Sequence, residues 1–165
     1  LDEPFANLDA ATRRRLLDHL PAWLSQMNTT AVVVTHDREE ALRVADDLAI
    51  IAAGQLIAHG AVRDVLAAPP NRCAAELLGF TLLPHGDDLV AVPADALQLG
   101  ADVLGDVSFQ VLVQRVVDLG GRREVIGAVA GVAVRVQLLA EDAPLAGDTV
   151  TATAKRHVSF ADGDG

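Results

Sequence analysis

The stretch that decides the fold is Leu1-Asp2-Glu3-Pro4-Phe5-Ala6-Asn7-Leu8-Asp9, read together with Val32-Val33-Val34-Thr35-His36-Asp37. The first part places two adjacent carboxylates before a proline and a third carboxylate a short loop later. The second part is an apolar, β-branched run that ends in a histidine. Ligands of a parallel α/β sheet bind at the carboxyl ends of neighbouring strands, so we expect Asp2 and His36 to converge at one such edge.

Phosphoryl transfer to water needs three kinds of group, and the two stretches hold a candidate for each. A carboxylate must hold Mg²⁺, another group must orient and polarise the water, and donors must neutralise charge that develops on the γ-phosphate oxygens. Asp2, Glu3 and His36 are the right residue types for these roles. Singly they are weak signals, because an Asp-Glu pair is most often solvated surface and a histidine at a strand end is usually structural. Their order and spacing together favour a nucleotide-hydrolysing site.

The same stretches resemble motifs of the ATPase subunits of ABC transporters. Residues 1–9 are similar to the end of the Walker B strand, the catalytic glutamate and the D-loop, and residues 32–37 are similar to the H-loop. Residues 39–79 are similar to the rest of this ATPase domain in bacterial importers. The resemblance implies ATP and Mg²⁺ as cofactors.

By position, the resemblance also implies a role for each site residue. Asp2 would bind Mg²⁺, Glu3 would be the general base for the attacking water, and His36 would sense the γ-phosphate. Asp9 would be the D-loop residue that signals across a nucleotide-sandwich homodimer. Cofactor binding is thereby assigned to Asp2, Asp9 and His36. The usual Ser-Ala-Leu-Asp of the D-loop is changed at Ala6-Asn7, which leaves Asp9 in place.

Composition limits the class of protein. The 165 residues are 51% hydrophobic and 22% charged, which is enough to bury one good core or two small ones. The net charge of −10 argues against a nucleic-acid surface, because phosphates are bound by Lys and Arg. The single cysteine, Cys73, excludes an internal disulfide and suits a reducing compartment. No apolar run reaches the roughly 18 to 20 residues of a membrane span and no signal peptide opens the chain, so we expect a cytoplasmic location.

The phosphate-binding loop that such a site needs does not occur in these residues. The sequence has no Gly-x-x-x-x-Gly-Lys-Ser/Thr, and it also lacks the signature motif and the Q-loop of the family. It begins without Met, inside a motif whose strand should already have started. We therefore expect a C-terminal fragment of a longer subunit, inactive as an ATPase when it is alone.

Periodicity predicts the elements of the first 79 residues. An amphipathic helix is expected at 10–27, capped by Asp9 and kinked or divided in two by Pro21. Residues 31–35 are expected to form a strand buried on both faces of a parallel sheet. The remaining expected elements are a helix at 38–45 capped by Asp37, hairpin strands at 48–52 and 55–59, and short helices at 61–67 and 71–78.

From Phe80 onward the pattern changes to short alternating segments, which predict a small barrel of the OB type. Alternate residues of the segment 107–119 are apolar, and Arg115 breaks this alternation, as fits either a strand that leaves the core or a bulge. Residues 132–138 alternate in the same way, and 149–154 and 157–160 are expected as closing strands. The apolar side chains of the first segment are Val107, Phe109, Val111, Val113, Val117 and Leu119, and turns are expected at Gly120-Gly121, Gly131 and Gly147-Asp148.

This second part resembles the TOBE module that follows the ATPase domain in importers for oxyanions, iron, polyamines and sugars. The similar stretches are residues 92–99, 117–121 and 146–150, with Val92 in place of the usual arginine. The implied fold class is α/β, part of a RecA-like P-loop NTPase domain of the ABC type, followed by an all-β, OB-like TOBE barrel. The expected domains are 1–79 for the ATPase part, 80–161 for the barrel and 162–165 for a disordered tail.

Three functions stay open at this point. The leading one is an ATP-hydrolysing subunit of an ABC importer, which couples ATP binding and hydrolysis to solute uptake. Its partners would be a second ATPase subunit in a homodimer, membrane permease subunits and, indirectly, a solute-binding protein, with no nucleic acid. This would place it peripherally on the inner face of the cell membrane. The transported solute stays open among iron, molybdate, sulfate, polyamines and sugars.

The two alternatives come from other classes. One is a stand-alone TOBE-type module that binds an oxyanion or a regulatory protein, against which counts the absence of a Lys, Arg and Ser cluster on the predicted strands. The other is a DNA-repair ATPase of the ABC type, which shares the Asp-Glu and His elements. In that class the histidine is not followed by a hairpin, a short Pro-bounded helix and a β-barrel, and the net charge of −10 is unfavourable.

Overall fold

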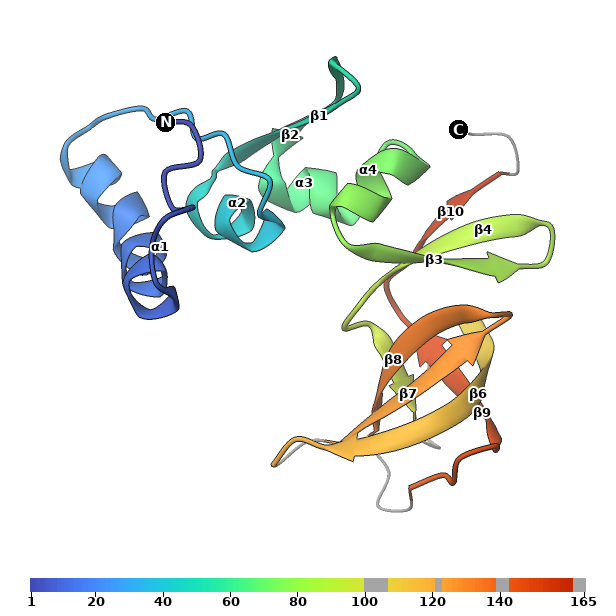
Figure 1. The fold of residues 1–165 in the computed structure, drawn as a ribbon. Helices are drawn as coiled ribbons and strands as arrows, with labels where there is room; N and C mark the ends of the chain where they lie inside the picture. The colour runs from blue at the N-terminus through green and yellow to red at the C-terminus, as the bar shows by residue number, and fades with distance from the viewer. Residues whose placement is uncertain (100–106, 121–122, 139–142, 162–165) are drawn as a thin grey trace. The chain divides into compact units, whose positions relative to one another are not determined.

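The computed structural model describes residues 1–99, 107–120, 123–138 and 143–161 (Figure 1). The chain packs as two compact units, Leu1–Pro70 and Asn71–Gly165. The predicted domain limits at residues 79 and 80 stay a prediction. The predicted turn residue Gly121 and the predicted disordered tail at 162–165 lie outside the described residues. Within those residues, no helix has both the length and the apolar character to cross a bilayer.

Helix α1 (Ala10–Gln26) begins at Asp9, as the sequence predicts. The Asp9 carboxylate accepts hydrogen bonds from the backbone N–H groups of Ala11, at 3.0 Å, and Thr12, at 3.1 Å. These bonds satisfy two of the donors that a helix start leaves unpaired. Pro21 lies inside α1, and the helix continues past it to Gln26, so the predicted division in two is wrong. A proline removes a single backbone donor, and the turns on either side keep theirs.

The elements of the first unit from α2 onward follow the predicted order. Asp37 caps α2 (Arg38–Val44) by accepting from the N–H groups of Glu39 and Glu40. The antiparallel hairpin turns at Ala53-Gly54, where both residues have positive φ. Its strands are β1 (Asp47–Ala52) and β2 (Gln55–Ala61), and α3 (Val62–Ala67) follows them.

Residues 31–35 do not form the buried strand that the sequence predicts. Only an isolated parallel bridge occurs there, between Asp2 and Val34. The side chains of Val32 and Val34 are 75% and 56% exposed. A β-branched run is buried only where other elements cover both of its faces. The described residues give this run one neighbouring strand segment and no cover over these two side chains.

The second unit opens with a helix and a three-stranded sheet. Asn71 caps α4 (Arg72–Leu77) by accepting from the N–H of Ala74 at 2.8 Å. The sheet has the order β10-β4-β3 (Figure 1), so residues 157–160, predicted as a closing strand of the barrel, pair elsewhere. The physical reason is that β9 already pairs on both edges within the barrel. The three strands are β3 (Phe80–His85), β4 (Asp88–Pro93) and β10 (Val158–Phe160).

The predicted OB-like barrel is present and closed, with the strand order β5-β8-β7-β6-β9 (Figure 1). Alternate side chains fill it, including Phe109, Val111, Val125 and Val136. Its strands are β5 (Leu97–Leu99), β6 (Val107–Asp118), β7 (Arg123–Val129), β8 (Val132–Leu138) and β9 (Thr149–Ala154).

Of the two alternatives that the sequence leaves open at Arg115, the structure shows the bulge. The pairing of β6 with β7 shifts register between Val113 and Arg115. Because one extra residue exchanges the two faces of a strand, Val116 packs against the core beyond the bulge and Leu119 is exposed. The prediction that Val117 and Leu119 share the inward parity of Val113 is therefore wrong.

Candidate functional site

The candidate site forms where the first three residues run beside residues 32–36. The amino group of Leu1 donates to the carbonyl of Val32 at 2.8 Å, and the N–H of Val34 donates to the carbonyl of Leu1 at 2.8 Å. The N–H of Glu3 then donates to the carbonyl of Val34 at 2.9 Å. These backbone bonds bring the two motif stretches side by side.

Glu3 and His36 meet directly, although they lie 33 positions apart in the sequence. Oε1 of Glu3 is 2.6 Å from Nδ1 of His36 and also accepts the backbone N–H of His36 at 3.1 Å. The side chains are 35% exposed for Glu3 and 85% exposed for His36. One carboxylate oxygen thus fixes both the backbone and the ring of His36, and the ring stays open to solvent.

The backbone of Glu3 is strained. Its φ of 43° lies in the left-handed region, where a non-glycine residue costs on the order of 1–3 kcal/mol. Pro4 follows it, and the residue before a proline is restricted further, toward extended conformations. The bonds to Val34 and His36 hold Glu3 in this conformation. Strain of this kind is concentrated at functional sites, and here it aims the carboxylate at His36.

Asp2 and Asp9 take other positions. Asp2 is exposed at the bridge, and Asp9 is occupied as the cap of α1. Hydrogen bonds from Thr12, its side chain first and then its backbone N–H, lower the pKa of the Asp9 carboxyl. Within the described ranges, neither carboxylate makes a hydrogen bond or an ion pair with Glu3 or His36. The structure therefore brings together two of the four predicted site residues.

The carboxylates near the Glu3–His36 contact can supply only part of the ligands of a Mg²⁺ ion. Mg²⁺ in nucleotide sites is held by one or two carboxylates together with phosphate oxygens and water. Asp2 is an exposed carboxylate beside the Glu3–His36 contact in the chain. In the part of the chain that the structure describes, no group of three or more His, Cys, Asp or Glu residues is placed to hold a metal. Asp2 thus fits the role of a single protein ligand.

We expect the titration of His36 to report the contact with Glu3. The Glu3 carboxylate, through its hydrogen bond and then through its charge, raises the pKa of His36. Stabilisation from this contact is complete below the unfolded-state pKa of about 6.5 and is lost as pH rises through the higher folded-state pKa. The Glu3→Gln variant should move the pKa down, measured by NMR of the imidazole resonances. A matched Glu39→Gln variant should leave it in place; equal shifts in the two variants would contradict the contact.

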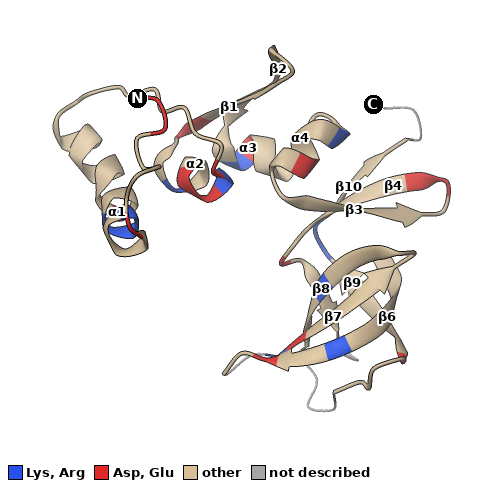
Figure 2. Ribbon diagram, viewed as in Figure 1, with Lys and Arg blue, Asp and Glu red and all other residues tan. Residues whose placement is uncertain are grey.

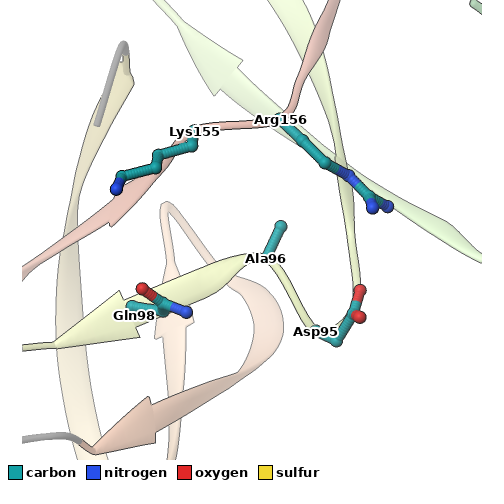
Figure 3. Close-up of a pocket in the computed structure, with 5 residues that line it drawn as sticks. All are labelled: Asp95, Ala96, Gln98, Lys155 and Arg156. Carbon is teal, nitrogen blue, oxygen red and sulfur yellow. The ribbon is translucent and has the colours of Figure 1, made fainter. Parts of the chain in front are cut away.

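A second candidate site lies on the barrel unit. It is a small open pocket of about 170 Å³, lined by Asp95, Ala96, Gln98, Lys155 and Arg156 (Figure 3). Lys155 and Arg156 come from the segment after β9, and in this view their side chains extend in opposite directions. Sequence reasoning missed them because it considered the alternation along strands. The signal was the consecutive run Lys155-Arg156-His157, which contains the single lysine of an acidic chain.

Comparison with known proteins places the chain. No protein-family model matches it. The sulfate/thiosulfate import ATP-binding protein CysA of Mycobacterium tuberculosis (strain H37Rv) is 34% identical over 177 residues, which cover 99% of this chain and 50% of that protein. The molybdate/tungstate import ATP-binding protein WtpC of Thermococcus kodakarensis is 41% identical over 86 residues, 52% of this chain and 26% of that protein.

A third relative is the putative 2-aminoethylphosphonate import ATP-binding protein PhnT of Salmonella typhimurium. It is 44% identical over 80 residues, which cover 48% of this chain and 22% of the relative. The matched residues thus span between about a fifth and a half of the length of these proteins. The match to CysA runs through both the mixed α/β part and the closed five-stranded barrel. Over most of its length, the chain is homologous to the ATP-binding subunits of ABC importers.

Proposed function

We propose that this chain is the C-terminal part of an ATP-hydrolysing importer subunit, which couples ATP binding and hydrolysis to solute uptake. The observation that carries the proposal is the 2.6 Å contact between the Glu3 carboxylate and the His36 imidazole. A carboxylate and a histidine, held together at the end of bridged strand segments, can supply two of the groups that phosphoryl transfer to water requires, a base for the water and a donor to the γ-phosphate. The homology to import ATP-binding proteins supports the same conclusion.

In this proposal each site residue has a chemical task. Bound Mg-ATP supplies the phosphoryl group that is transferred to water. Glu3 takes the proton of the attacking water, because a carboxylate in the ionised form is the available base. In the protonated ring, whose pKa Glu3 raises, Nδ1–H of His36 donates to Glu3 and Nε2–H is left to donate to a γ-phosphate oxygen. Asp2 holds Mg²⁺, and Asp9 at the start of α1 faces a second ATPase subunit.

The partners and the location follow from the same assignment. The subunit forms a homodimer in the cytoplasm and binds permease subunits at the inner face of the membrane, and a solute-binding protein acts indirectly through them. The relatives' names specify sulfate, thiosulfate, molybdate, tungstate and 2-aminoethylphosphonate. These compounds share an anionic oxygen-bearing centre, so we assign an oxyanion as the class of solute.

The experiment that tests the proposal is an ATPase assay. The protein to assay is a subunit as long as the relatives, encoded in the same reading frame as residues 1–165. It must contain these residues and a phosphate-binding loop. Hydrolysis of Mg-ATP by this subunit and its loss on replacement of Glu3 support the proposal. A full-length subunit that binds no ATP overturns it.

A second candidate function is oxyanion binding by the barrel, and the pocket in Figure 3 is the observation that favours it. Lys155 supplies a cationic donor and Gln98 an amide, whereas the Arg156 side chain extends away from Lys155 and the Asp95 carboxylate also lines the pocket. A charge-assisted hydrogen bond contributes about 1.5–3 kcal/mol, so Lys155→Ala should weaken binding of sulfate, molybdate or tungstate about tenfold or more. Calorimetric titration of the 165-residue chain measures this effect.

The matched control for the pocket is Arg135→Ala, which removes a cation from an exposed position on β8. It should leave anion affinity unchanged at constant ionic strength. Equal losses in the two variants would mean that only the net charge matters. The absence of heat on titration of the unaltered chain would remove the barrel as an oxyanion site.

A further inference from the structure

Glu40 is the only charged residue among the described parts of the chain that is buried, with 4% of its surface exposed. It lies on α2, four positions after His36. A buried carboxylate is costly unless hydrogen bonds and a cation compensate it. The hydrogen-bond and ion-pair partners of Glu40 therefore indicate its structural role.

One carboxylate oxygen of Glu40 holds the segment that carries His36. The hydroxyl of Thr35 donates to Oε2 of Glu40 at 2.7 Å, and the same hydroxyl accepts the backbone N–H of Asp37 at 3.0 Å. These two bonds fix the residues on both sides of His36. The backbone N–H of His36 is then presented to Oε1 of Glu3 at 3.1 Å.

The other carboxylate oxygen of Glu40 faces Arg13 on α1, and Arg13 in turn bonds the loop that ends at Asp9. Oε1 of Glu40 lies 3.5 Å from Nε of Arg13, in the first part of α1. Arg13 also donates from a terminal nitrogen to the carbonyl of Leu8 at 3.5 Å. Its buried Nε–H is close to Glu40 without the alignment of a hydrogen bond. Glu40 and Arg13 therefore form an ion pair without a hydrogen bond from Nε.

We propose that Glu40 is a positioning residue that holds the backbone of His36 against Glu3 and links it, through Arg13, to the loop before Asp9. The connected groups are the Thr35 hydroxyl, the Glu40 carboxylate and the Arg13 guanidinium. The importance of this link for hydrolysis rests on the proposed function. The positional claim rests only on the contacts within residues 8–40.

The chain offers a matched control for this claim. Arg43 on α2 and Asp18 on α1 form a second ion pair between the same two helices, at 3.2 Å. Both side chains are exposed, and Figure 2 shows that α2 carries charges of both signs. The Asp18–Arg43 pair joins the helices without contacting residues 35–37. A simple role in helix packing would be shared by both pairs, whereas positioning of His36 is expected of Glu40 alone.

The test uses NMR of the 165-residue chain without nucleotide. In Thr35→Val, which keeps size and charge, the amide proton of His36 should exchange about tenfold faster because its neighbours are released. The imidazole pKa should move down, while the other carboxylates that raise it, Asp37 and Glu40, stay in place. Thr35→Ser should restore both values, and Glu40→Leu should accelerate exchange as Thr35→Val does. Asp18→Asn should change neither.

The proposal is overturned if Thr35→Val leaves the His36 amide protected, or if Asp18→Asn exposes it to the same extent. If Glu40→Leu does not fold, the exchange rates and pKa values of Thr35→Val and Thr35→Ser test the proposal. In a full-length subunit, Thr35→Val should lower kcat with KM for ATP unchanged. If that subunit hydrolyses no ATP before substitution, the proposed function fails, and the NMR result on Glu40 stands separately.

Discussion

Replacement of Glu3 by Gln in a full-length subunit should slow ATP hydrolysis by at least about a hundredfold and leave ATP binding intact. Gln has nearly the shape of Glu, and its amide oxygen can still accept the backbone N–H of His36, as Oε1 of Glu3 does at 3.1 Å. It cannot accept the proton of the attacking water. The loss should therefore fall on the chemical step, with the position of His36 largely kept.

Two measurements separate binding from chemistry in this variant. Nucleotide affinity should stay within about threefold of the unaltered subunit, and single-turnover hydrolysis should show the full loss. Glu39→Gln is the matched control, because it makes the same chemical change at an exposed position on α2. Glu3→Ala should differ from Glu3→Gln by also releasing the His36 amide. Hydrolysis by Glu3→Gln at an unchanged rate would exclude Glu3 as the general base.

The sequence was sufficient to identify Glu3 and His36 as candidates, but not to show how they are held. The sequence predicts that Asp2 and His36 converge, whereas the carboxylate that contacts His36 belongs to the next residue, Glu3. Glu40 escaped notice because a glutamate near a helix start reads as a solvated residue that suits the helix dipole. Its burial and its bonds to Thr35 and Arg13 exist only because α2 packs against α1. Contacts of this kind depend on tertiary packing, which local spacing does not encode.

The same distinction holds for the fold: some elements could be predicted from the local sequence pattern, and others depend on tertiary packing. The barrel strands could be predicted because a closed barrel supplies an interior for every alternate side chain, and the bulge at Arg115 interrupts that alternation visibly. The strand at 31–35 could not, because burial of Val32 and Val34 requires neighbours on both faces. The apolar pattern predicts that these side chains are buried, but the described residues do not cover them, so both are exposed.

Replacement of Gly127 by Ala should lower the free energy of unfolding of the barrel unit by about 1–3 kcal/mol, the usual cost of an overpacked core. Gly127 lies on β7 opposite Val113, beside the register shift of β6. A Cβ at this position would lie 2.5 Å from the carbonyl oxygen of Leu112 and 2.7 Å from Cγ1 of Val111. The first of these atoms belongs to the backbone, so a change of side-chain rotamer cannot relieve the clash.

The comparison that isolates this clash is Gly131→Ala, in the turn between β7 and β8. Gly131 has a φ of 88°, so alanine there is strained, yet nothing lies within 4 Å of its added Cβ. Its cost should be the backbone term alone, about 1 kcal/mol. Urea unfolding followed by circular dichroism should therefore rank Gly127→Ala as the less stable variant. The reverse order would mean that β6 shifts at its bulge to admit the methyl group, and that the close approach of the two strands is not required for closure of the barrel.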